Sequence, residues 1–296
     1  MTERARIFAI TLGLMAGVTA LFVVTLWVLL RVSEEGGFPG GRKVAIVEIE
    51  GTIVDTSDIV HELRDHLDNS SVRAVVVRIN SPGGVVGPTQ EVYEELRRLR
   101  KAGKPVVASL GAVAASGGYY IAAAANRIYA NPGTLTGSIG VIMQLPNVEG
   151  LLKKIGVEYV VVKAGAHKDL GNPSRPMTPE ERRILQALLD DVHGQFIDAV
   201  AEGRHLDRRA VTAVADGRIF SGKQAKSLHM VDALGGLQDA VEGAAELAGL
   251  PPHPRVIEPR RRFSLFDLLR NQLDLRGLAG MAVRSPLMKM PLYLMD

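Results

Sequence analysis

Apolar runs of strand length alternate with amphipathic segments through the first half of the chain after residue 43. The runs rich in Val, Ile and Ala predict strands, and the segments with apolar residues three or four positions apart predict helices. The predicted strands are Val44–Ile49, Ala74–Ile79, Val106–Leu110 and Val157–Val162, and the predicted helices are Ser57–Leu67, Thr89–Lys101 and Gly117–Ala125. This alternation predicts an α/β fold with a mainly parallel sheet and helices on its faces.

A long helix is predicted over Thr178–Arg204, because apolar residues keep helical spacing throughout it. Thr178 can cap this helix, Pro179 suits its first turn and Glu181 completes a capping box. The pattern favours a helix of the core or of an interface. Shorter helices near Arg208–Ala215 and Leu237–Leu247 follow it, and no internal repeat is present.

The N-terminal region contains an uncharged, mostly apolar run of 24 residues, Ile7 to Leu30. About 20 such residues cross a bilayer, so the run predicts a transmembrane anchor that contacts membrane lipid. A cleaved signal peptide is the alternative, but it would have a shorter apolar region and a small-x-small cleavage site. Basic residues flank both ends of the run, so charge alone does not orient it. Ser33 to Gly41 contains four glycines and a proline and predicts a flexible tether.

The composition changes after Pro251. Arg260, Arg261 and Arg262 precede apolar residues, which indicates either a helix on the membrane surface or a segment packed on the domain or on a neighbouring subunit. The last residues, 286–296, form an apolar tail for which the sequence suggests no role. The expected organisation is therefore an N-terminus (1–6), an anchor (7–30), a linker (31–42), a protein domain (43–250) and a C-terminal extension (251–296).

Composition and charge exclude several classes of function. The chain has no cysteine, so disulfides and thiol catalysis are excluded. The formal net charge of +3 and an aromatic content of 5% give no indication of nucleic-acid binding. No His-Glu-x-x-His, phosphate-binding P-loop or Ser-x-x-Lys motif is present, and no metal or cofactor is expected.

Ser116 is the candidate nucleophile, because it lies on a turn of small residues directly before an apolar helix. Serine is also an ordinary residue at a helix N-terminus, and Ala114 stands where the Gly-x-Ser-x-Gly elbow of α/β-hydrolases has glycine. A lysine can serve as the base for such a serine if it is desolvated. Lys163 and Lys168 are candidates for that lysine, although most lysines are solvated. A triad using His167 or His193 stays formally open.

An oxyanion hole is expected from the backbone N–H groups of Gly83 and Gly117. Glycine suits both positions, because a substrate carbonyl must come within hydrogen-bonding distance of the backbone. Ser81-Pro82-Gly83-Gly84 could be only a turn. Its position after the strand Ala74–Ile79, at the edge where parallel sheets bind ligands, favours a functional role.

These segments together resemble the signal peptide peptidase A family of membrane-bound serine proteases in its short, single-copy form. The matching motifs are Ile79–Gly84, the Ser116 segment, Gly137–Ile142 and the run from Lys163 to Thr178, in the family's order. The resemblance implies a ClpP/crotonase-like fold and a Ser-Lys dyad of Ser116 and Lys168, with the Ser138 hydroxyl orienting the lysine amine.

The resemblance also implies a location and an assembly. The anchor would lie in the bacterial inner membrane, with a cytoplasmic N-terminus and an extracytoplasmic domain that cuts apolar peptides such as released signal peptides. In the family's tandem form, one copy supplies the lysine and the other the serine. A single-copy chain is therefore expected to form a homo-oligomeric ring with active sites between subunits.

Two other functions are open at this stage. One is a crotonase-type acyl-CoA enzyme, which would use the oxyanion donors without a nucleophilic serine. The other is a catalytically silent membrane scaffold of the same fold. Covalent labelling of Ser116 excludes the first, and a cellular role that depends on Ser116 and Lys168 excludes the second.

Overall fold

The computed structural model describes residues 13–27, 41–259 and 292–294. The chain divides into two compact units, Met1–Arg42 and Lys43–Asp296. In the first unit, residues 13–27 form a helix. None of the helices in the described ranges has both the length and the apolar character needed to cross a membrane. The predicted anchor, Ile7–Leu30, extends beyond the described residues at both ends, and most of the predicted tether and the basic segment from Arg260 also lie outside them.

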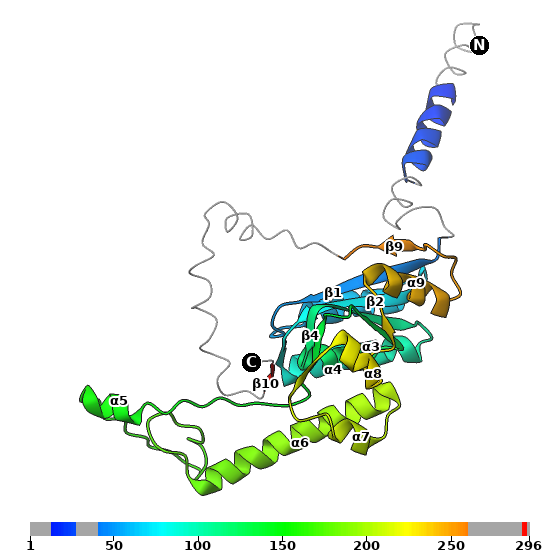
Figure 1. Ribbon diagram of the computed structural model, residues 1–296. Helices are drawn as coiled ribbons and strands as arrows, with labels where there is room; N and C mark the ends of the chain where they lie inside the picture. Colours follow the sequence, from blue (N-terminus) through cyan, green and yellow to red (C-terminus); the bar gives the residue numbers. More distant parts are fainter. Residues whose placement is uncertain (1–12, 28–40, 260–291, 295–296) are drawn as a thin grey trace, which may run out of the picture. The chain divides into compact units, whose positions relative to one another are not determined.

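In the second unit, eight described strands form one sheet (Figure 1). The hydrogen-bonded path runs β7-β6-β4-β2-β1-β9; off this path β5 pairs with β4, and β8 pairs with β5. All pairs are parallel except β6 with β7. The strands are β1 (Lys43–Glu50), β2 (Val72–Ser81), β4 (Val106–Ala115), β5 (Arg127–Ala130), β6 (Leu135–Gly137), β7 (Ile219–Ser221), β8 (Ala233–Leu234) and β9 (Arg255–Ile257).

The strand β4 divides the sheet, because its first half pairs with β5 and its second half with β6. Between these halves, Thr134 Oγ1 donates a hydrogen bond of 2.7 Å to the carbonyl of Gly111. The split leaves the carboxyl end of β4 beside β6, where Ala115 pairs with Gly137. The residues that follow both strands therefore meet at one edge of the sheet.

Helices cover both faces of the sheet, as buried parallel strands require. Alternate residues of β1 face opposite sides, so Ala45 and Val47 join the larger core with α2, α3, α4 and α6, whereas Val44 and Ile46 join the smaller core with α9. The helices are α2 (Ser57–Asp68), α3 (Val86–Lys101), α4 (Gly117–Ala123), α5 (Glu149–Lys154), α6 (Pro179–Arg204), α7 (Arg208–Thr212), α8 (Gly222–Ser227) and α9 (Leu237–Leu247).

Two short strands form a separate pair at the edge of the fold. β3 (Gly83–Val85) follows β2 directly, and β10 (Leu292–Leu294) pairs with it in the antiparallel direction. On its other side β3 bonds to Ile53, because Ile53 N–H donates to the Gly83 carbonyl and Val85 N–H to the Ile53 carbonyl. In Figure 1, β10 lies near the start of α4.

The structure confirms the mixed α/β organisation with a mostly parallel sheet. Every helix predicted after residue 43 is present within a few residues, and α6 has the predicted capping box between Thr178 and Glu181. The strand predicted over Val157–Val162 is wrong. That segment has no regular structure and its side chains are exposed, and no strand among the described residues pairs with it.

Candidate active site

Ser116 lies between the end of β4 and the start of α4. Its backbone has φ 52° and ψ −118°, a conformation that L residues rarely adopt. Hydrogen bonds hold the turn on both sides: Ser116 N–H donates to the Gly137 carbonyl at 2.8 Å, and Tyr120 N–H donates to the Ser116 carbonyl at 2.8 Å. The side chain is fully buried, and Oγ has no hydrogen-bond partner among the described residues. A strained, unpaired hydroxyl at a strand-to-helix turn indicates a functional position.

The backbone of Gly117 packs directly against that of Gly83 and Gly84. A Cβ on Gly117 would lie 2.9 Å from Thr89 Oγ1, 3.2 Å from Gly84 N and 3.3 Å from Gly83 Cα. Gly117 is the first residue of α4, so its N–H has no acceptor within the helix. The structure thus brings Ser116, Gly117 and Gly83 together.

Gly83 itself has φ +107°, which only glycine adopts without strain. Its N–H donates to Ser81 Oγ at 3.1 Å, a contact that the sequence did not predict. The Ser81 hydroxyl is buried and fixes the turn. An oxyanion bound at Gly83 would have to share or replace this contact.

Ser138 occupies a position like that of Ser116, in the turn that follows the neighbouring strand. It directly follows β6, has φ 51° and is 5% exposed. Because Ala115 pairs with Gly137, the two serines leave adjacent strands at the same level. Ser138 N–H donates to the Arg218 carbonyl at 2.8 Å, which fixes this second turn.

Lys168 lies elsewhere, on a segment we call the arm (residues 142–178), which joins the sheet to α6. Its side chain is exposed, and its amine has no hydrogen bond or ion pair to any described residue. The other candidate, Lys163, forms an ion pair with Asp169 and donates to the Ala166 carbonyl at 2.8 Å. Of the two lysines, therefore, only Lys168 has an amine without a partner in the described chain.

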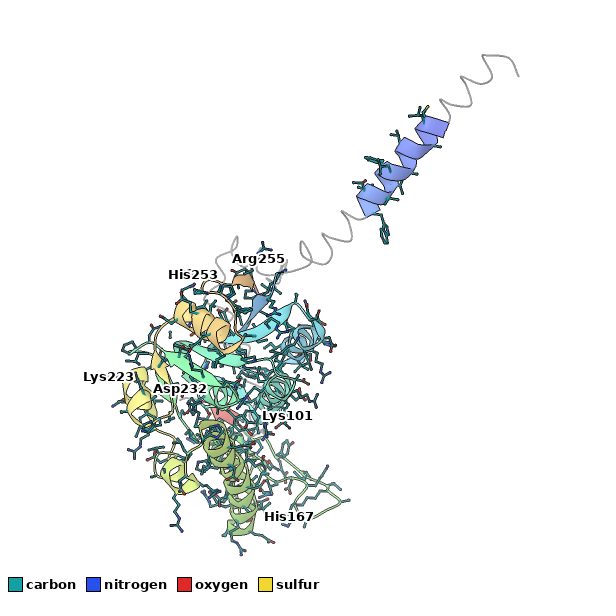
Figure 2. The ribbon with its side chains drawn as sticks, turned by 90° about the vertical axis from the view of Figure 1, so that its right-hand side faces the viewer. Lys101, His167, Lys223, Asp232, His253 and Arg255 are labelled. Carbon is teal, nitrogen blue, oxygen red and sulfur yellow. The ribbon has the colours of Figure 1, made fainter. Side chains whose placement is uncertain are left out.

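The length of α6 shows how far Lys168 lies from Ser116. His167 Nε2 lies 3.8 Å from Glu180 in the first turn of α6, and Figure 2 shows His167 at that end of the helix. Tyr120, four residues after Ser116, contacts Phe196 with ring centroids 5.0 Å apart. At about 1.5 Å per residue, Glu180 and Phe196 are about 24 Å apart along the helix. Within one chain, Ser116 and Lys168 are therefore on the order of 20 Å apart.

Charged side chains attach the arm to the start of α6. Arg175 donates to the carboxylates of both Asp169 and Glu181. The hydrogen bond from Arg175, with a second from the Thr178 backbone, lowers the pKa of Glu181 to about 2. Hydrogen bonds from Lys163 and Arg175 lower the pKa of Asp169. Asp169 is thus turned toward Lys163 and Arg175.

The arm exposes apolar side chains to an unusual degree. Val162 is 96% exposed and Val160 74%, and Figure 1 shows α5 extending away from the sheet. Other exposed apolar side chains follow on the same segment and on the first half of α6: Leu151, Ile155, Val157, Tyr159, Ile184 and Leu188. Large exposed apolar patches mark surfaces that bind another protein, a ligand or a membrane.

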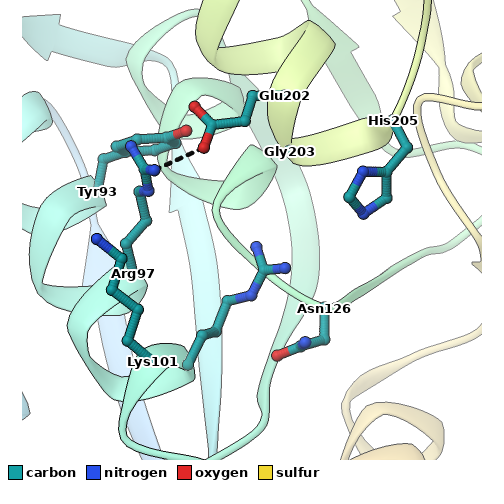
Figure 3. A pocket seen from close by; sticks show the side chains of 8 residues that line it. Tyr93, Arg97, Lys101, Asn126, Glu202, Gly203 and His205 are labelled. Atoms are coloured by element: carbon teal, nitrogen blue, oxygen red, sulfur yellow. Dashed lines mark hydrogen bonds and ion pairs between the residues drawn. The ribbon is translucent and has the colours of Figure 1, made fainter.

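A cavity of about 330 Å³ lies between the ends of α3 and α6 (Figure 3), and Ser116 is not among the residues that line it. Arg97 and Glu202 form an ion pair across it, and its charged lining includes none of the predicted site residues. Within the described ranges, no group of three or more His, Asp or Glu side chains could hold a metal ion.

Comparisons with known proteins identify a peptidase family. The model of peptidase family S49 matches residues 98–251, a range that includes Ser116, Ser138 and Lys168. A Synechocystis sp. protein provisionally named a protease is 48% identical over 212 residues, covering 71% of this chain and 76% of its own. A protein of Enterococcus faecium provisionally named signal peptide peptidase SppA is 32% identical over 241 residues, covering 77% of this chain and 70% of its own.

A longer relative matches over a smaller part of its length. Protease 4 of Salmonella typhi is 37% identical over 219 residues, which are 71% of this chain but 35% of that protein. The family model spans more than half of the chain, and the first two relatives match over most of both lengths. The chain therefore belongs to peptidase family S49, the family of signal peptide peptidase A.

Proposed function

We propose that this protein is a serine endopeptidase with a Ser-Lys dyad, in which Ser116 is the nucleophile and Lys168 of a neighbouring subunit is the general base. The observation that carries the proposal is the Ser116 turn: a buried, unpaired hydroxyl at φ 52° beside the Gly83 and Gly117 backbones. Membership of a peptidase family supports it. The finer fold assignment, a ClpP/crotonase-like fold, is part of the same proposal.

The proposed reaction follows from the position of each group. Ser116 Oγ attacks the peptide carbonyl, and its proton passes to the Lys168 amine. The N–H groups of Gly83 and Gly117 bind the oxyanion, where such donors are each worth about 10²- to 10³-fold in rate. The lysine then gives its proton to the leaving amine, and water hydrolyses the acyl-enzyme with the lysine again as base.

The separation of Ser116 and Lys168 in one chain supports active sites between subunits of a ring. The arm that carries Lys168 exposes apolar side chains that a neighbouring copy would cover. In that contact Lys168 would lose water, as a neutral base requires, and Ser138 would orient its amine. Ser138 suits this role, because it is buried at the same level of the sheet as Ser116.

The proposed location is the bacterial inner membrane, with the Ile7–Leu30 run as anchor and the catalytic unit on the extracytoplasmic side. The support is the length of the apolar run. Proposed substrates are apolar peptides near the membrane, including released signal peptides, since an E. faecium relative carries that name.

The test is peptide hydrolysis by the full-length chain in detergent, combined with labelling by a fluorophosphonate. We expect a covalent adduct on Ser116, and a loss of at least about 10³-fold in kcat/KM for Ser116→Ala. Ser109→Ala is the matched control, because Ser109 is another buried serine of the same strand region, bonded to Arg78. Peptide hydrolysis by Ser116→Ala, or labelling elsewhere, would show that Ser116 is not the nucleophile. A wild-type chain that neither hydrolyses peptides nor is labelled would favour the acyl-CoA enzyme or the scaffold.

Activity is also expected to persist in the presence of a metal chelator and of thiol reagents. The sequence contains no cysteine, and the proposed reaction uses no metal. Loss of hydrolysis on chelation, restored by a divalent cation, would contradict the dyad.

A further inference from the structure

Four charged side chains join the turn that carries Lys168 to the start of α6. Lys163 and Arg175 both bind the Asp169 carboxylate, and Arg175 also binds Glu181 in the first turn of the helix. The Arg175 Nε and Nη2 groups donate to Asp169 Oδ2 at 3.1 and 2.9 Å, and its Nη1 group donates to Glu181 Oε2 at 2.9 Å. We call Lys163, Asp169, Arg175 and Glu181 the clamp.

The two carboxylates of the clamp are shielded from water. The Glu181 side chain is 5% exposed and that of Asp169 is 11% exposed, whereas that of Arg175 is 31% exposed. Leaving a shielded carboxylate without its partner is costly, so both carboxylates depend on the Arg175 guanidinium. Arginine suits this position, because its planar fork can bind two carboxylates at once, whereas the ammonium of lysine is a single point charge.

The clamp holds a turn that its own backbone does not attach to α6. Three backbone hydrogen bonds of 3.0–3.2 Å form this turn, and they run from Lys168 to Gly165, from Leu170 to His167 and from Asn172 to Asp169. Because all three are local, they shape the turn without joining it to the helix. The Arg175 contacts with Asp169 and Glu181 make that connection. A further contact, from His167 Nε2 to Glu180, is longer, at 3.8 Å, and more exposed.

Glu181 is itself fixed to the helix and the helix to the core. The Glu181 carboxylate accepts a hydrogen bond of 2.9 Å from the Thr178 N–H, and the Glu181 N–H donates to Thr178 Oγ1 at 3.2 Å. The second half of α6 is buried in the core, where Phe196 is fully covered. A continuous path therefore runs from the core through α6, Glu181 and Arg175 to the backbone beside Lys168.

A lysine that acts as a general base needs such a path. The base must come within about 2.6–3.2 Å of the group that gives up its proton, and the lysine amine ends a flexible four-carbon side chain. The clamp also has no net charge, since two cations face two carboxylates. Without Arg175 it would carry a net negative charge beside Lys168, and a nearby negative charge favours the protonated form of a lysine over the neutral base.

We propose that Arg175 is a positioning residue for the general base: it fixes the Lys168 turn to α6, so that each subunit presents Lys168 in one place to the Ser116 site of its neighbour. This inference rests on the proposed function. Arg175 acts through Asp169 and the backbone rather than through contact with the substrate. Its loss should therefore slow the chemical step and leave substrate binding nearly unchanged.

The kinetic test compares variants of Arg175 with the wild-type full-length chain in detergent. Arg175→Ala should lower kcat about 10²-fold and change KM by less than about twofold. Arg175→Lys, which keeps the charge and loses the fork, should lower kcat by about tenfold or more. The matched control is Arg208→Ala, which removes an exposed ion pair with Asp198 of α6 and should be as active as wild type. A wild-type kcat in Arg175→Ala, or a rise in KM in place of the fall in kcat, would overturn the inference.

Mixed rings show on which half of the site Arg175 acts. Arg175→Ala chains are dissociated and reassembled at equal ratio with Ser116→Ala chains or with Lys168→Ala chains. With Ser116→Ala, an intact serine meets an intact lysine turn at about one interface in four, so up to about a quarter of wild-type activity should return. With Lys168→Ala, every lysine turn is damaged, and we expect no activity beyond that of Arg175→Ala. The opposite order, or the same result in both mixtures, would overturn the inference.

Hydrogen exchange tests the clamp without hydrolysis and separates the two proposals. In assembled Ser116→Ala chains, adding Arg175→Ala should speed exchange of the amides of residues 168–172 by about tenfold or more, and the Tyr120 amide in the Ser116 turn should exchange as before. Unchanged exchange at residues 168–172 would overturn the inference even if the wild-type chain hydrolyses peptides. If a reference mixture of Ser116→Ala and Lys168→Ala chains recovers no activity, the shared active site is wrong, and the exchange rates alone then decide whether Arg175 fixes the turn.

Discussion

The backbone of Ser116 is predicted to store strain that substitution by glycine releases. Its φ of 52° and ψ of −118° fall outside the regions open to L residues. Alanine at this position keeps the strain and removes the hydroxyl. Glycine removes both. The difference in unfolding free energy between Ser116→Gly and Ser116→Ala therefore measures the contribution of the backbone conformation alone.

The magnitude follows from two opposing effects. Relief of such a conformation is worth about 1–3 kcal/mol. Glycine lowers the free energy of unfolding by about 0.5–1 kcal/mol relative to alanine, because it has greater conformational freedom in the unfolded chain. Ser116→Gly should therefore be more stable than Ser116→Ala by about 1 kcal/mol, and both should be inactive. The comparison does not depend on whether Lys168 bonds to the hydroxyl, because both variants lack it.

Ser109 provides the matched control. It is equally buried but lies within β4 and has no positive φ. Here Ser109→Gly should be less stable than Ser109→Ala by about 0.5–1 kcal/mol. The sign of the difference thus reverses between two serines of one strand region.

The assay is urea unfolding of the Lys43–Asp296 unit followed by far-UV circular dichroism, since the single tryptophan, Trp27, lies outside that unit. Protein concentration is held fixed, because assembly would shift the transition. If Ser116→Gly is less stable than Ser116→Ala by the margin found at Ser109, the turn is unstrained and the reasoning is refuted.

Gly117→Ala should lower kcat about 10²-fold or more, because its Cβ would lie 3.2 Å from Gly84 N and disturb the oxyanion donors. The control, Gly133→Ala, should be as active as wild type, because its Cβ would have no atom within 4 Å. Equal kcat values in the two variants would contradict this. Lys168→Arg should be as inactive as Lys168→Ala, since arginine stays protonated, and activity in the arginine variant would show that Lys168 is not the base. The folded pKa of Glu181, about 2, is below its ordinary value of 4.5, so its stabilising contact is complete above about pH 4.5 and is lost as the pH falls toward 2. Cleavage of the arm by an acid-active protease should increase through that range, and Glu181→Gln should reduce this pH dependence, leaving the part that Asp169 contributes.

Local patterns predicted most of the fold. Helix α9 has the predicted bounds, and α6 begins at the predicted cap, because caps and apolar spacing act within a few residues. Helix α3 begins three residues earlier than predicted, directly after β3. Strands depend on partners, which is why Val157–Val162 reads as a strand but remains unpaired.

The site was predictable only in part. Motifs identified Ser116, Gly83 and Gly117, and the parallel sheet explains why they meet. The positive φ of Ser116 and Ser138 is not visible in the sequence, because serine rarely adopts it. The contact of Ser81 Oγ with Gly83 and the Arg175 ion pairs depend on side-chain positions, and the β10 pairing joins residues about 200 positions apart, which no local pattern encodes.

The most direct test of the shared active site mixes two inactive proteins. Ser116→Ala and Lys168→Ala chains are dissociated, combined at equal ratio and reassembled. If each site takes Ser116 from one subunit and Lys168 from the next, random closure of the ring restores an intact pair at about one interface in four. We predict recovery of up to about a quarter of wild-type activity, and no recovery in a preparation where wild type treated in the same way regains its activity would contradict the inter-subunit dyad.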